Sequence, residues 1–227
     1  MQLNDLSEDM HKACAPIGLV KVPARRGLYR NGIKRCFDLA AVLLSSILVL
    51  PLIAILALVV ALDGHPPFYL SDRVGRCGRT FRMLKLRTMV EDADAQLAEY
   101  LDQNTQARSE WAKTQKLKID PRITFIGRFL RKTSMDELPQ LWNVLIGDMS
   151  LVGPRPMMPT QRSIYSGLAY YGLRPGLTGP WQISCRNESD FSKRAEFDAV
   201  YDDQLSFAAD IKILFKTLGA VARGTGY

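Results

Sequence analysis

The chain has 227 residues, enough for one domain of ordinary size with a membrane element. Its net charge of +7 indicates an anionic partner, which is nucleic acid, an anionic membrane face or a phosphorylated substrate. His11 and His65 are its only histidines, which disfavours a histidine-based metal site or a Ser-His-Asp triad. The four cysteines are scattered without a Cys-x-x-Cys pair, so we expect reduced thiols and neither a disulfide framework nor a zinc site.

The N-terminal stretch, residues 1–33, is expected to be a polar and then basic tail. Residues 1–20 contain no apolar run of the kind that marks a signal peptide. Six basic residues and no acid follow between Lys21 and Phe37. Such runs are usually just solvated, but this one adjoins an apolar segment, where it can bind anionic lipid headgroups.

The apolar segment Leu39–Leu62 has about 24 residues without a charge, which is long enough to span a bilayer. Pro51 stands in its middle and should break or kink the helix, with Ser45 and Ser46 as candidate partners for the freed carbonyls. Both flanks are basic, so the positive-inside rule places both ends in the cytoplasm. We therefore expect a re-entrant helix–break–helix over residues 34–63, in preference to a kinked full span or a buried core helix.

Residues 64–227 are predicted to form a cytoplasmic domain that begins with a β-hairpin between Pro67 and Met89, with its turn at Gly75–Gly78. The six cations of this hairpin fall on both of its faces. Two interpretations stay open. The hairpin is a solvated ribbon lying on anionic lipid, or it binds phosphate through Lys85 or Arg87 at the end of the return strand.

Helical patterns fill most of the remaining chain, so the predicted fold class is α+β, mainly helical, in a monotopic membrane protein. Glu91–Leu117 has a sparse apolar stripe typical of an amphipathic hairpin, and Ile123–Lys132 is predicted to be a short amphipathic helix. Two helices close the chain, Ala195–Leu205 and Ala208–Ala222. The second alternates apolar and basic residues in the pattern of an interfacial helix.

The most informative stretch is Thr133–Pro156, which opens with the adjacent acids Asp136 and Glu137. Apolar residues at helical spacing follow, and Pro139 favours a helix in which Asp136 is the N-cap over one capped by Ser134. On one interpretation Asp136 only caps this helix and Glu137 only favours its dipole. On the other, two carboxylates beside upstream cations hold a metal and a phosphate.

Two stiff segments follow this stretch. Gly153–Pro156 forms a turn, and Arg174–Gln182 is rich in glycine and proline, as in loops of fixed shape that line a site. A purely structural turn is the alternative for the second segment. Arg186 lies just beyond it in a polar stretch.

The order and spacing of these motifs are specific, and the chain resembles the bacterial sugar transferase family from about Lys34 to the C-terminus. These proteins are the monotopic phosphoglycosyl transferases that prime glycan assembly on a polyprenyl phosphate. The motifs that carry the resemblance are Lys34-Arg35 with Phe37-Asp38, Lys85–Met89, Asp120–Thr124, Asp136–Pro156 and Arg174–Ser184. Within the family the chain is similar to short members that prime exopolysaccharide synthesis from UDP-galactose or UDP-glucose.

The resemblance implies roles for single residues. Asp136 matches the family nucleophile, and Glu137 matches the partner that holds Mg²⁺. Arg131 and Arg186 match arginines that contact the substrate phosphates, and Arg155 lies where the family approaches the nucleotide. Pro51 matches the break of a re-entrant membrane helix, although Leu50 precedes it where some members have serine.

The implied reaction transfers hexose-1-phosphate from a UDP-sugar to polyprenyl (undecaprenyl) phosphate, releasing UMP through a phosphosugar-aspartate intermediate. It would take place at the cytoplasmic face of the bacterial inner membrane, in contact with membrane lipids and without nucleic acid. Whether the protein acts as a monomer or a homodimer is left open. The competing hypothesis is a basic membrane-surface adaptor without chemistry, which would leave the placement of Asp136 and Glu137 unexplained.

Overall fold

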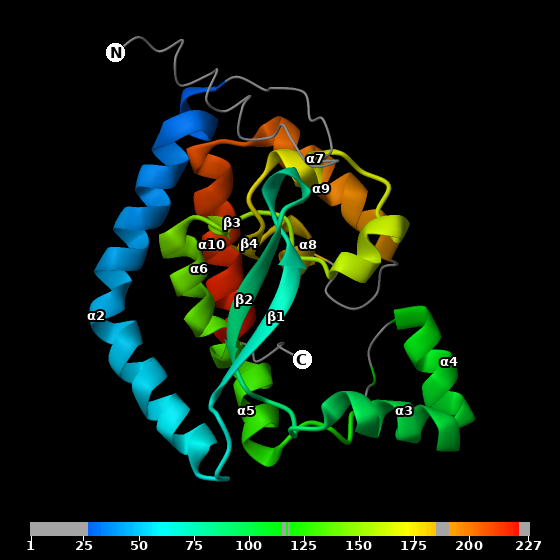
Figure 1. Ribbon diagram of the computed structural model, residues 1–227. Coiled ribbons are helices and arrows are strands. Elements are labelled where there is room, and N and C mark those ends of the chain that lie inside the picture. Colours follow the sequence, from blue (N-terminus) through cyan, green and yellow to red (C-terminus); the bar gives the residue numbers. More distant parts are fainter. Residues whose placement is uncertain (1–26, 115–116, 118, 185–190, 223–227) are drawn as a thin grey trace.

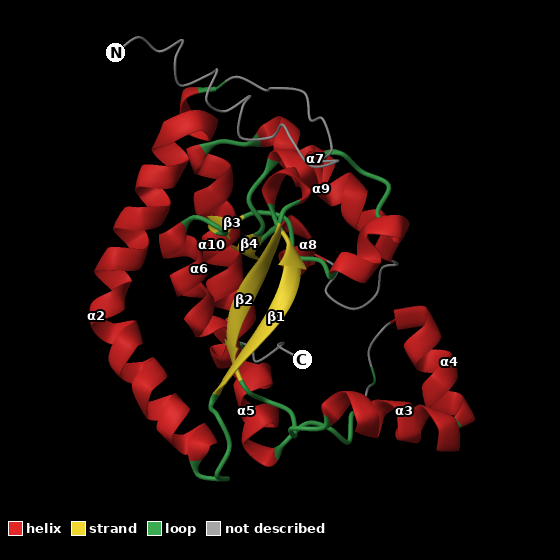
Figure 2. Cartoon of the chain, in the orientation of Figure 1, coloured by secondary structure: helices red, strands yellow, loops and turns green. Residues whose placement is uncertain are grey.

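The computed structural model describes residues 27–114, 117, 119–184 and 191–222. Helices dominate these residues and surround two small sheets (Figures 1 and 2). The first sheet is antiparallel, with β1 (Phe68–Val74) paired to β2 (Thr80–Leu86), and the second is parallel, with β3 (Ser150–Val152) paired to β4 (Gly176–Thr178). This confirms the mainly helical prediction and the hairpin, whereas the parallel pair was not predicted.

The long apolar helix is continuous where a break was expected. After a short π-helical turn, α2 (Lys34–Ala61) runs through Pro51 and curves along one side of the molecule (Figure 1). Ser45 and Ser46 donate to the carbonyls of Val42 and Leu43, three residues back. They do not serve the carbonyl four residues before Pro51, so their predicted role is wrong. A single missing hydrogen bond bends this helix without ending it.

Both ends of α2 are held by the rest of the protein. At the N-terminal end Val42 belongs to the main core, together with Phe81, Met83 and Val144. At the other end Val60 packs with residues of β2 and α5 in a separate cluster. Between these anchors the large apolar side chains of α2 are exposed. In its most apolar stretch of 18 residues, only 11% of the residues are buried. Of the described residues, this helix alone is long and apolar enough to cross a membrane.

The hairpin is fastened to the core by a buried amide from α6 (Leu141–Ile146). The Asn143 side chain accepts from Leu84 N at 3.0 Å and donates to Arg82 O at 2.8 Å. These bonds fix which face of β2 turns inward.

In the turn of the hairpin, Cys77 adopts a left-handed conformation with φ 57° and is disulfide-bonded. The prediction of reduced thiols is therefore wrong for Cys77, whereas Cys36 is free.

The two stiff segments predicted from their glycines and prolines lie side by side. β3 leads into the first and β4 lies in the second, and Gly153 N donates to Thr178 O at 2.9 Å. A Cβ on Gly153 would overlap the carbonyl oxygen of Arg174. Glycine is therefore required for this close approach.

The remaining helices surround these sheets, and the amphipathic patterns located most of them correctly. The hairpin α3–α4 projects from the body beside α5 (Figure 1). Their bounds are α3 (Ala93–Gln103), α4 (Thr105–Thr114), α5 (Phe125–Thr133), α7 (Ala169–Gly172), α8 (Pro180–Ser184), α9 (Arg194–Gln204) and α10 (Phe207–Ala222), with the 3₁₀-helices η3 (Met135–Gln140), η4 (Pro159–Ile164) and η5 (Phe191–Lys193).

The basic run before α2 turns inward where it is described. Arg30 pairs with Asp202 at 2.6 Å, and Lys34 pairs with Asp210 at 2.6 Å. Arg35 donates to two backbone carbonyls of α6. The described cations of the run therefore contact the protein itself, and Arg30 and Lys34 do so through carboxylates of α9 and α10. The earlier cations of the run are outside the described residues.

Asp210 is the centre of this contact and is fully buried. Besides Lys34, it accepts from the hydroxyls of Tyr29 and Tyr201, each at 2.6 Å. Asp210→Asn should lower the free energy of unfolding by about 3–5 kcal/mol, because it strands a partly buried ammonium beside a neutral amide. Thermal unfolding in detergent measures this.

The matched control is Asp102→Asn, which breaks the exposed Arg108–Asp102 pair of 3.0 Å and should cost less than about 1 kcal/mol. Equal effects of the two substitutions would show that the Asp210 contacts do not hold α2 to α10.

Candidate active site

The two acids of the central motif meet Lys85 from the end of β2. Lys85 Nζ lies 2.8 Å from Glu137 Oε1 and 3.4 Å from Asp136 Oδ2. Asp136 is only 6% exposed, whereas Glu137 is half-buried. A cation thus bridges two adjacent carboxylates at the point where the hairpin meets η3.

The local fold differs from the predicted cap. α5 ends at Thr133, its C-cap Ser134 adopts a left-handed conformation with φ 56°, and η3 begins at the next residue, Met135. Asp136 therefore lies inside a 3₁₀-helix and is not an N-cap, and Pro139 lies in the same helix. The prediction failed because the left-handed residue reverses the chain immediately after α5, which sequence periodicity does not reveal.

Burial raises the pKa of the Asp136 carboxyl, and the adjacent charge of Glu137 adds to this effect. The charges of Lys85 and Arg131 act in the opposite direction. Burial is the larger influence on the Asp136 carboxyl. Because the folded pKa is raised, the protonated form of Asp136 persists to higher pH than for an exposed aspartate.

Arg131, on the last turn of α5, reaches the same place. Its Nε donates to Thr88 Oγ1 at 2.9 Å, and the charges of Asp136 and Glu137 act on its guanidinium. Burial lowers its pKa, and these carboxylates oppose that shift. Gly127 allows the approach, because a Cβ there would overlap the backbone oxygen of Thr88. The structure therefore brings Arg131 to the predicted acids.

Arg131→Lys tests whether this guanidinium binds phosphate as a fork. Lysine keeps the charge but cannot offer two parallel N–H donors, so the rate of the sugar-phosphate transfer that the family resemblance implies should fall about tenfold to hundredfold. Arg128→Lys, on the exposed side of the same helix, is the matched control and should keep the wild-type rate. Retention of full activity by Arg131→Lys would remove Arg131 from the site.

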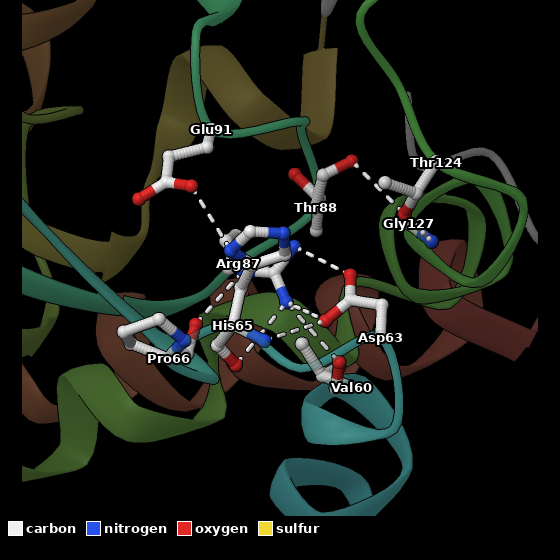
Figure 3. Close-up of polar contacts among 9 residues, drawn as sticks. All are labelled: Val60, Asp63, His65, Pro66, Arg87, Thr88, Glu91, Thr124 and Gly127. Carbon is white, nitrogen blue, oxygen red and sulfur yellow. Dashed lines mark hydrogen bonds and ion pairs between the residues drawn. The ribbon is translucent and has the colours of Figure 1, made fainter.

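Arg87 is engaged elsewhere. Its guanidinium bonds Asp63, 2.8 Å from Oδ2, and also the backbone oxygens of Val60 and Pro66 (Figure 3). These partners lie at the C-terminal end of α2 and just beyond it. The structure therefore places Arg87 as a link between α2 and the hairpin, while its predicted phosphate contact remains untested.

The other two predicted substrate ligands are arginines of the C-terminal half. Arg155 is half-buried, and its Cζ lies 6.0 Å from the centroid of the Trp181 ring. Arg186 lies outside the described residues. Thr88 was missed by the sequence reasoning, since a threonine that fixes an arginine carries no local signal.

The site fits the predicted magnesium ion in its donor chemistry. Within the described ranges no group of three or more histidine, cysteine or acidic side chains could enclose a metal. Asp136 and Glu137 supply two carboxylates, however, and Mg²⁺ is commonly held by one or two carboxylates together with substrate phosphate oxygens. Together with the oxygens of a substrate diphosphate, this pair of carboxylates could therefore hold Mg²⁺. Without that ligand, Lys85 contacts both carboxylates.

The site thus places a buried aspartate beside an acidic partner, a lysine and an arginine. The sequence assigns its class: residues 29–224 match the bacterial sugar transferase family, and the chain belongs to it. The match includes α2 and every described element after it.

Several curated proteins are similar to this chain. It is 44% identical to an exopolysaccharide production protein, ExoY, of Sinorhizobium fredii, over 90% of this chain and 93% of that protein. It is 48% identical to a UDP-galactose-lipid carrier transferase of Erwinia amylovora and 47% identical to an undecaprenyl-phosphate galactose phosphotransferase of Salmonella typhimurium. Each of these two alignments covers 86% of this chain but 41% of the relative, so the chain spans about two-fifths of their length.

Proposed function

We propose that this protein transfers hexose-1-phosphate from a UDP-sugar to undecaprenyl phosphate as a priming step of exopolysaccharide synthesis. The observation that carries the proposal is the contact of Lys85 with Asp136 and Glu137 in a chain of this family. The relative named for exopolysaccharide production supports the pathway. The relative named for galactose supports galactose as the sugar, and a relative named for glucose makes glucose the alternative.

The proposed chemistry has two steps. An Asp136 carboxylate oxygen attacks the sugar-linked phosphorus, the bond to the bridging oxygen breaks, and UMP leaves with that electron pair. A phosphate oxygen of undecaprenyl phosphate then attacks the same phosphorus, and Asp136 is released. Arg131 and Lys85 neutralise the phosphate oxygens. Bound Mg²⁺, held by Glu137, would supply further neutralisation of the diphosphate charge.

The test is release of UMP from UDP-galactose and UDP-glucose by the detergent-solubilised protein with Mg²⁺ and undecaprenyl phosphate. We expect UMP and a lipid-linked sugar diphosphate in equal amounts. A membrane adaptor without chemistry would release neither, and that result would refute the proposal.

We also propose that α2 enters and leaves the membrane by its cytoplasmic face. A helix of 28 residues is about 42 Å long, enough to cross a bilayer. Yet Lys34 at one end and Val60 at the other both bind the same globular body. A full span would carry one end to the opposite membrane face, away from these partners. The curvature of α2 allows a shallow path (Figure 1).

Cys36 near the start of α2 reports this topology, since it is exposed and free. In intact cells a membrane-impermeant thiol reagent should label neither Cys36 nor an introduced cysteine in His65→Cys, and both should react after permeabilisation. Cys36→Ser gives the background from the other cysteines. Labelling of one end alone from outside would establish a full span.

A further inference from the structure

Three arginines from distant parts of the chain converge away from Asp136. Arg73 lies on β1, Arg155 follows β3, and Arg194 begins α9. Arg194 Cζ lies 4.3 Å from the centroid of the Trp181 ring, and Arg155 Cζ lies 6.0 Å from the same centroid. Two of these cations therefore make cation–π contacts with Trp181, and the positive charge of Arg73 acts on Arg194.

The positive charge of this cluster is not fully compensated by the described residues. Burial lowers the pKa of Arg194 to about 10, and the charge of Arg155 contributes. Burial and then Arg155 likewise lower the pKa of Arg73. The carboxylate that acts on Arg194 is Asp198, whose own pKa burial raises to about 7 while the Tyr165 hydroxyl donates to it at 2.8 Å.

Two donors in this cluster are also left without partners. The Nε atoms of Arg73 and Arg194 are buried and make no hydrogen bond. Burying a charged donor without an acceptor costs free energy, and proteins retain such groups where a ligand satisfies them. The missing partner of three convergent guanidinium groups is an anion, and phosphate matches their geometry.

The hairpin register relates this cluster to Asp136. Tyr69 pairs with Lys85 and Arg73 pairs with Phe81, so Lys85 and Arg73 lie on the same face of the sheet. Four residues of strand separate the two positions by about 13 Å. The charge of Glu137 nevertheless acts on Arg73. Phe81 and Met83 lie between them on this face and are buried in the core, so one anionic ligand would contact both groups at the ends of their long side chains.

We propose that Arg73, Arg155 and Arg194 bind the phosphate that departs with UMP. Arg155 was already expected near the nucleotide, whereas Arg73 and Arg194 are newly assigned. This inference rests on the proposed function. When the bond to the sugar-linked phosphorus breaks, the bridging oxygen keeps the electron pair and becomes a terminal oxygen of UMP. The negative charge on that phosphate increases by one, and three fixed guanidinium groups stabilise it.

The experiment measures binding of UMP and of uridine to the full-length protein in detergent by calorimetry. Arg73→Gln and Arg194→Gln should each weaken UMP binding about tenfold or more, the equivalent of one charge-assisted hydrogen bond, and leave uridine binding unchanged. Arg82→Gln removes the same charge from the exposed face of the same hairpin, and it should bind UMP like the wild type. Arg73→Lys and Arg194→Lys replace any glutamine variant that does not fold, and should bind UMP with intermediate affinity.

Wild-type affinity in the Arg73 and Arg194 variants, or failure of the wild-type protein to bind UMP, overturns the inference. So does equal binding of anionic lipid vesicles and UMP at these residues, since the anion would then be a headgroup. If UMP is released from a UDP-sugar while these variants bind it normally, only this inference fails. If no UDP-sugar yields UMP, the proposed function fails.

Discussion

Asp136→Asn should reduce UMP release by about four orders of magnitude or more, because a neutral amide cannot form the proposed phosphosugar intermediate. In the wild type, UMP should appear before undecaprenyl phosphate is added, in an amount no greater than the enzyme present. The protein should then gain the mass of one hexose phosphate, on the peptide that contains Asp136. Mass spectrometry after mixing with UDP-sugar measures both signals.

The charged groups around Asp136 make it important to check the fold and the ligand binding of Asp136→Asn. Asp136 is buried beside Lys85, so Asp136→Asn removes one of the two carboxylates that Lys85 contacts. The variant should still unfold like the wild type and still bind UMP, because Arg73, Arg155 and Arg194 are unchanged. Release of UMP only when the acceptor is present, with no labelled peptide, would instead indicate direct transfer and reduce Asp136 to a general base.

As the pH is lowered, activity should also be lost at a higher pH than for an ordinary aspartate. The attacking form is the ionised carboxylate, and burial raises the pKa of Asp136. Since the group is protonated below its folded pKa, the loss occurs as pH falls through that raised value.

Hydrophobic periodicity predicted the elements in which the pattern of apolar and polar side chains follows burial. The hairpin and α5, α9 and α10 have apolar residues at regular spacing, and the structure contains them near the predicted bounds. The parallel β3–β4 pair could not be predicted this way, because each strand has three residues and exists only where Gly153 meets the Arg174 loop. The continuity of α2 through Pro51 was also missed, since sequence alone does not distinguish a bend from a break.

The direction of the charged side chains was the least predictable feature. Lys34 binds Asp210, which lies 176 residues further along the chain. The composition of the basic run therefore could not show whether its cations contact the protein or are solvated. Arg87 and Lys85 were predicted together, yet Arg87 lies just beyond the end of β2, and the two side chains bind different partners, Asp63 and Glu137. Arg73 and Arg194 had no signal beyond their charge, because their convergence depends on the hairpin register and on the start of α9.

Glu137→Gln is expected to lower activity by about two to three orders of magnitude and to weaken the binding of Mg²⁺. The substitution keeps the size of the side chain but removes the carboxylate that lies 2.8 Å from Lys85 Nζ. If Glu137 holds the metal against the diphosphate, the variant loses that ligand and needs far more Mg²⁺ for its residual rate. Steady-state rates across a series of Mg²⁺ concentrations measure this shift.

Glu196→Gln provides the matched control, since Glu196 is an exposed acid on α9 and its loss should leave the Mg²⁺ dependence unchanged. A second comparison separates metal binding from the ion pair, because Lys85→Met removes the cation while keeping both carboxylates. A shift of the rate to higher Mg²⁺ concentrations in Glu137→Gln but not in Lys85→Met would assign the metal to Glu137. If Glu137→Gln instead matches the wild type at low Mg²⁺, Glu137 serves only to hold Lys85, and the diphosphate charge is neutralised by Lys85 and the arginines alone.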